Sequence, residues 1–118
     1  MEDENWITGF EMELDKATQA RASGNEGRAR VCARRAAGIA ASEYCRENSI
    51  PLIGNAFTRL AALLDHPKTP EKAREIIDHL LIRVDLEHHL PGSIDLIADT
   101  RLLPQALNLG TNQSSPTR

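Results

Sequence analysis

Apolar residues recur every three or four positions along nearly the whole chain, and no segment shows the two-residue alternation of a half-buried strand. This spacing predicts helices over residues 5–22, 26–47, 52–64, 70–88 and 94–103. The connections between them are short, which favours antiparallel packing of neighbouring helices. The sequence therefore predicts an all-α protein, an up-and-down helical bundle of four main helices plus a shorter C-terminal helix.

The length of 118 residues suits one domain, which we expect over 5–107, followed by a flexible tail over 108–118. Aromatic residues make up only 3% of the chain, so the core must consist mainly of Leu, Ile and Ala. No apolar run approaches the ~18 residues of a membrane span. The N-terminus is acidic and lacks the layout of a secretory signal. We therefore expect a cytoplasmic protein without a membrane partner.

The segment 26–47 carries a narrow stripe of small residues at helical spacing. The members of this small-residue stripe are Ala29, Cys32, Ala33, Ala36 and Ala40. Small side chains let a neighbouring backbone approach closely, and such a face is unusual in solvent. We therefore predict that the stripe is an interface and that the chain forms a homodimer, since twofold dimers are the commonest oligomers.

Arginines flank the stripe and have two interpretations. Arg28, Arg30, Arg34 and Arg35 are candidates for phosphate or RNA contact, because a guanidinium matches phosphate oxygens. The other interpretation is salt bridging to the acidic first helix together with a solvated face. The net charge of −3 and the scarcity of stacking aromatics make nucleic acid the less favoured partner.

Motifs that define common catalytic classes are absent from the sequence. It contains no phosphate-binding glycine loop and no Gly-x-Ser-x-Gly nucleophile motif. Cys32 and Cys45 lie 13 positions apart on one predicted helix, too far apart to bridge. Asp85 and His88 form a single pair with metal-ligand spacing, and a second pair is lacking. We therefore predict no metal and no cofactor.

The first two predicted helices resemble the opening of HEPN-type helical bundle domains. The resemblance rests on Ala20, Gly24, Asn25 and Ala29, which form a helix end, a glycine turn and the start of an Ala-rich, Arg-containing helix. Helix number and order are also similar over about residues 5–107. The resemblance implies a HEPN-like bundle, and for that family it implies a partner of the nucleotidyltransferase type.

HEPN proteins with ribonuclease activity carry an arginine followed, four to six residues later, by a histidine. Arg83 and His88 match this spacing and its location late in the domain. By resemblance, Arg83 would bind the scissile phosphate and His88 would assist proton transfer across a dimer interface. We predict a dimerisation or protein-interaction module without demonstrable catalysis. The alternative is a metal-independent, toxin-like endoribonuclease that uses Arg83 and His88.

Overall fold

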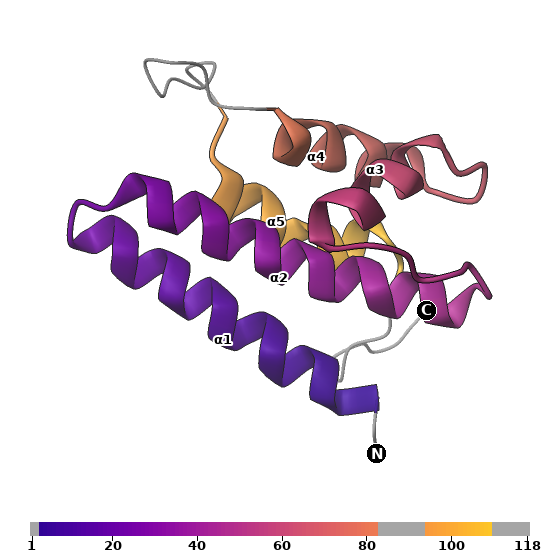
Figure 1. The fold of residues 1–118 in the computed structure, drawn as a ribbon, viewed down its shortest axis with the longest axis horizontal. Helices are drawn as coiled ribbons and strands as arrows, with labels where there is room; N and C mark the ends of the chain where they lie inside the picture. The colour runs from indigo at the N-terminus through magenta and orange to yellow at the C-terminus, as the bar shows by residue number, and fades with distance from the viewer. Residues whose placement is uncertain (1–2, 83–93, 110–118) are drawn as a thin grey trace.

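The computed structural model describes residues 3–82 and 94–109, and these residues form five helices and no strand (Figure 1). The helices are α1 (Asp3–Ala22), α2 (Glu26–Glu47), α3 (Ala56–Asp65), α4 (Glu71–Leu81) and α5 (Leu96–Ala106). Each helix packs against the next one in the chain, and α5 returns to contact α1 and α2. The prediction of an all-α, up-and-down bundle is confirmed.

The two longest helices form an antiparallel hairpin, which Figure 1 shows as the pair α1 and α2 lying side by side. Gly24 ends α1 with a positive φ of 85°, a conformation that glycine adopts without steric penalty. The backbone N–H of Asn25 donates to the carbonyl oxygen of Ala20 at 2.8 Å, and that of Gly24 donates to Arg21 at 3.0 Å. The Asn25 side chain then accepts from the backbone N–H of Arg28. The predicted turn is confirmed, because its chemistry is local.

The third helix begins later than the spacing predicted, at Ala56 instead of position 52. Gly54 has a φ of 65°, which takes the backbone out of helical geometry. The Asn55 side chain accepts from the backbone N–H of Thr58 at 3.0 Å and so caps α3. The asparagine cap therefore sets the start of α3 four residues after the predicted position 52.

The start of α4 is not capped by the threonine that precedes it. Thr69 is buried, and its hydroxyl donates to the carbonyl oxygen of Leu63 at 2.7 Å, so it closes the end of α3 instead. Pro70 occupies the cap position of α4 without a side-chain bond. The helix ends at Leu81, and Ile82 is extended with a ψ of 126°. The remainder of the expected helix, up to 88, lies outside the described residues.

The last helix includes Pro104 and runs to Ala106, three residues past the predicted end at 103. Asp95 caps α5 and accepts from two backbone N–H groups of its first turn. At the other end, the N–H of Leu109 donates to the carbonyl oxygen of Pro104 at 2.9 Å, around Asn108 with a φ of 61°. Leu109 is buried, so the packed domain extends past the expected tail boundary at 108.

The core is built from aliphatic side chains, as the aromatic content required. The largest fully buried apolar side chains are Leu14, Leu60, Leu63, Ile77, Leu80, Leu96, Leu103 and Leu107. Trp6 and Phe10 add an edge-to-face pair with ring centroids 5.9 Å apart on α1. None of the described helices is both long and apolar enough to cross a membrane.

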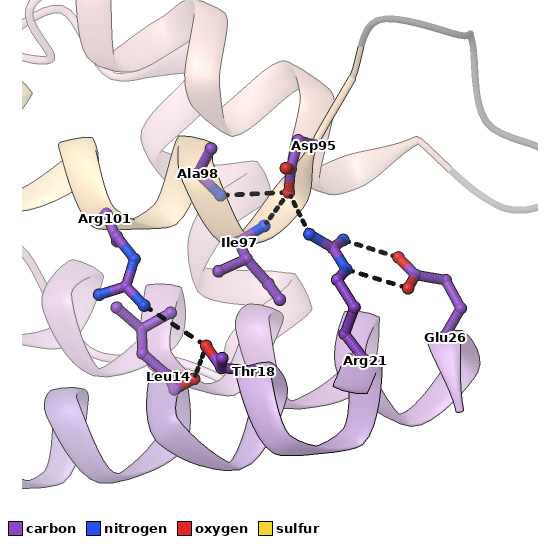
Figure 2. Close-up of polar contacts among 8 residues, drawn as sticks. All are labelled: Leu14, Thr18, Arg21, Glu26, Asp95, Ile97, Ala98 and Arg101. Carbon is purple, nitrogen blue, oxygen red and sulfur yellow. Dashed lines mark hydrogen bonds and ion pairs between the residues drawn. The ribbon is translucent and has the colours of Figure 1, made fainter. Parts of the chain in front are cut away.

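One arginine joins three helix ends, as Figure 2 shows. Arg21, at the end of α1, donates from Nε and Nη2 to the carboxylate of Glu26 at 3.0 and 2.7 Å. Its Nη1 lies 3.0 Å from Oδ1 of Asp95, the cap of α5. The hydrogen bonds from Arg21 hold the pKa of Glu26 below its usual value. This cluster ties the beginning of α2 and the beginning of α5 to α1.

Candidate functional site

The small-residue stripe is buried inside the single chain. Ala29, Cys32, Ala33, Ala36 and Ala40 all have 0% exposure within the single chain. Helices α1, α3 and α5 of the same chain pack against α2 and enclose the stripe. The prediction that the stripe is an intermolecular interface is therefore corrected: these residues lie at the centre of the core. The physical expectation of close helix approach holds, but the partner helices belong to the same chain.

Gly38, also on α2, shows how closely the helices approach. A Cβ atom added to it would lie 2.5 Å from the Cβ and 3.1 Å from the Cα of Ala56 at the start of α3. Only a glycine fits at such a contact, because real Cβ atoms do not come this near to another carbon. The close approach of α2 and α3 therefore depends on Gly38 having no Cβ atom.

The arginines of α2 divide into two groups. Arg34 is half-buried, and its Nε donates to the carbonyl oxygen of Leu80 at 2.7 Å while its Nη2 donates to that of Ile82 at 3.0 Å. The first carbonyl lies in the last turn of α4 and the second at the residue after it, where carbonyl oxygens have no partner within the helix. The guanidinium of Arg34 is thus engaged in closing α4.

The outer arginines have a different setting. Arg28 and Arg35 are exposed, and Arg30 is half-buried. The structure therefore does not bring the four predicted phosphate-contacting arginines together on one surface. It leaves Arg28 and Arg35 on the solvent side of α2 and turns Arg34 toward α4.

The two residues of the predicted catalytic pair, Arg83 and His88, lie outside the described residues. Their candidate role in an endoribonuclease therefore stays a prediction. The site that can be built from described side chains lies between α4 and α5 and includes His79, four residues before Arg83 in the sequence.

An open groove of about 790 Å³ runs between α4 and α5. Its apolar side chains are Pro70 at the start of α4, Ile76 from α4, and Leu102 and Ala106 from α5. Leu102 has 55% of its surface exposed, although it sits on a helix whose other leucines are buried or nearly so. Ile76 and Ala106 are half-buried. The groove thus offers apolar surface that the described residues leave uncovered.

Charged side chains surround this apolar surface. The groove is lined by three carboxylates, Glu71, Glu75 and Asp99, against one lysine, Lys72. Glu71, Glu75 and Lys72 are exposed. The groove is therefore acidic, and a ligand with positively charged groups at the rim would bind more favourably.

A histidine–aspartate pair joins the two helices that form the groove. Nδ1 of His79 lies 2.8 Å from Oδ2 of Asp99, and the two side chains are 29% and 21% exposed. When Nδ1 carries the ring proton, His79 donates to the carboxylate and Nε2 is left as an acceptor. The pair links α4 to α5 and sets their separation at the groove.

Metal binding is not supported by the described part of the chain, in which no group of three or more His, Cys, Asp or Glu residues could hold an ion. Two free cysteines, Cys32 and Cys45, are buried. Burial raises the pKa of the Cys45 thiol, and nearby Arg59 opposes this only in part. A protonated, buried thiol is a poor nucleophile. Neither cysteine lines the groove between α4 and α5.

The groove could not be predicted from the sequence because its residues come from two different helices. His79 and Asp99, which join these helices, are 20 positions apart. One signal was present in the sequence. Glu71 and Glu75 stand four residues apart on one side of α4, opposite the buried Ile77 and Leu80. Nothing in the spacing indicated that α5 would turn an exposed leucine toward the same side.

Comparisons with known proteins return no relative for this chain. The sequence matches no protein-family model and no curated protein, and the fold matches no solved structure at a significant level. The resemblance to HEPN domains therefore stays a prediction from the residues at the helical turn. A function has to be argued from the described side chains themselves.

Proposed function

We propose that this chain is a protein-interaction module whose contact surface is the groove between α4 and α5. The observation that carries the proposal is the exposed apolar surface at Leu102, framed by the carboxylates of Glu71 and Glu75. The predicted role as an interaction module is kept, but the surface differs from the small-residue stripe. The residues of the stripe are buried in the core of the chain.

The apolar part of the groove supplies the driving force for binding. Burying apolar surface is favourable by roughly 25 cal/mol per Å². Leu102 and Ile76 lie on facing sides of the groove, so one inserted side chain would cover both. A helix that lays its apolar face between two helices is a common recognition mode, and its ridge of side chains packs into the groove.

The charged rim selects what can bind. Three carboxylates and one lysine disfavour an anionic ligand such as nucleic acid, whose phosphates would meet like charge. They favour a helical surface that carries Arg or Lys beside an apolar side chain. The occupant we propose is therefore a cationic, amphipathic helical surface of a protein.

The alternative endoribonuclease, which would use Arg83 and His88, remains a prediction. The groove proposal does not depend on either residue. A loss of RNA cleavage on His88→Ala would support the ribonuclease, whereas the groove proposal expects this variant to bind as the wild type does.

A synthetic helical peptide of leucine and lysine tests the proposal. In an NMR titration of the full chain, we expect shifts of the amides over 71–79 and 99–106. We expect Glu71→Lys/Glu75→Lys to weaken binding by about tenfold or more, which corresponds to about 1.4 kcal/mol.

The control is Glu11→Lys/Asp15→Lys, which makes the same change in net charge on the exposed side of α1. We expect it to leave the dissociation constant within about twofold of the wild type. Equal weakening by both variants would mean that the peptide responds only to net charge. That result would refute the groove as the binding surface.

A further inference from the structure

The solvent side of α2 carries a short cationic surface with one apolar residue. Arg28, Val31 and Arg35 follow i, i+3 and i+7 spacing and so share one side of the helix. All three are exposed, and Val31 has 45% of its surface in contact with solvent. We refer to these three residues as the α2 flank. It has the combination of charge and apolar side chain that the groove favours.

The acidic side of α4 has a matching length. Glu71, Glu75 and Asp78 follow i, i+4 and i+7 spacing, and all three are exposed. Seven residues of helix span about 10.5 Å at 1.5 Å per residue, both from Arg28 to Arg35 and from Glu71 to Asp78. Two helices laid antiparallel would therefore place a carboxylate near each arginine. Val31 would then lie at the height of the groove, where Leu102 is exposed.

We propose that the occupant of the groove is the α2 flank of a second copy of this chain. This inference rests on the proposed function and names the partner of the same surface. The contact is heterologous, because the α2 flank of one copy meets the groove of the other. It replaces the small-residue stripe as the basis of the predicted self-association.

The expected association is weak and sensitive to salt. Exposed ion pairs each contribute only about 0–1 kcal/mol, and they are screened over about 8 Å at physiological ionic strength. Burial of Val31 against Leu102 adds an apolar contribution that salt does not screen. Self-association should therefore strengthen at low ionic strength and persist in part at high ionic strength.

Sedimentation of the full chain at increasing concentration tests the inference. We expect the wild type to self-associate at low salt. The association constant should fall by tenfold or more when NaCl is raised to about 0.5 M. Arg28→Glu/Arg35→Glu and Glu71→Lys/Glu75→Lys should each sediment as monomers. Both variants change exposed side chains only, and circular dichroism checks that each keeps its helices.

The decisive step is an equimolar mixture of the two charge-reversed variants. In the mixture both contacts between the two variants are complementary. The reversed flank of the first variant meets the reversed groove of the second, and the unchanged flank of the second meets the unchanged groove of the first. Recovery of association in the mixture, with neither variant associating alone, supports the proposal. Absence of recovery would overturn it.

A wild type that stays monomeric at low salt would also overturn the inference. If the leucine–lysine peptide still bound the groove in that case, the proposed function would stand and only its partner would be wrong. If neither the second copy nor the peptide bound, both proposals would fall.

Discussion

The guanidinium of Arg34, in the middle of α2, closes the last turn of α4 by donating to the carbonyl oxygen of Leu80 at 2.7 Å, across 46 positions of sequence. A second bond reaches the carbonyl oxygen of Ile82 at 3.0 Å. A positive charge at the C-terminal end of a helix is also favoured by the helix dipole. Arg34 thus ties the C-terminal end of α4, which forms one wall of the groove, to α2.

Replacing Arg34 should therefore destabilise the fold. We expect Arg34→Ala to lower the free energy of unfolding by about 1–3 kcal/mol, because two half-buried carbonyl groups lose a charged donor. Arg35→Ala is the matched control, since its side chain is exposed one position away, and it should change stability by no more than about 0.5 kcal/mol. Urea unfolding followed by circular dichroism measures both. Equal effects would show that Arg34 does not act through α4.

The contact of Gly38 with Ala56 predicts a strong effect of one methyl group. Gly38→Ala should destabilise the chain by about 1–3 kcal/mol, because the new Cβ would overlap the start of α3. Gly27→Ala, on the same helix, is the control. Its Cβ would meet only Asn25 Oδ1 at 3.9 Å. Alanine should therefore stabilise that position by up to about 1 kcal/mol through helix propensity. A stabilising Gly38→Ala would contradict the close approach of α2 and α3.

The end of α2 carries a serine where glycine is usual. Ser49 has a φ of 58°, and the N–H of Ile50 donates to the carbonyl oxygen of Cys45 at 2.8 Å around it. This left-handed conformation is unfavourable for residues with a Cβ. We expect Ser49→Gly to stabilise the fold by about 0.5–1 kcal/mol.

Gly24→Ala is the counterpart at the end of α1. The added Cβ would meet nothing within 4 Å, so only the positive φ of 85° opposes it. We expect a destabilisation of about 1 kcal/mol. Thermal unfolding of both variants gives the comparison, and the two shifts in Tm should have opposite signs. Shifts of the same sign would argue against left-handed strain at Ser49.

The Arg21–Glu26 bond predicts a pH dependence. Its hydrogen bonds hold the pKa of Glu26 below the usual value of 4.5, so the folded chain binds this proton less readily than the unfolded chain. The stabilisation is therefore present above that value and is lost as the pH falls through the folded pKa. We expect the stability difference between the wild type and Arg21→Gln to shrink as the pH falls from about 7 to about 3.

An NMR titration of the Glu26 carboxyl group provides the direct measurement. In Arg21→Gln, its pKa should return toward the usual value. The pKa of Asp95 should rise as well, because a hydrogen bond from Arg21 helps to lower it against the opposing effect of burial. An unchanged Glu26 pKa in the variant would show that the ion pair does not persist in solution.

Local chemistry was sufficient to predict much of the bundle. The all-α class followed from the helical spacing of apolar residues, and the turn at Gly24 and Asn25 followed from their capping properties. These features depend on residues within one or two turns of each other, so a single sequence contains the needed information. The predicted start of α3 at position 52 was wrong because the segment holds two start signals, Pro51 and Asn55, and the helix begins after the second.

The partners of each helix were decided only by the tertiary structure. The stripe from Ala29 to Ala40 required a closely packed neighbour, but spacing does not say whether that neighbour comes from the same chain. The same limit applies to Arg34, whose carbonyl partners lie 46 and 48 positions away, and to the groove at His79 and Asp99. The periodicity of apolar residues determines which face of a helix has to be buried. Which neighbour covers that face depends on how the five described helices pack around one core.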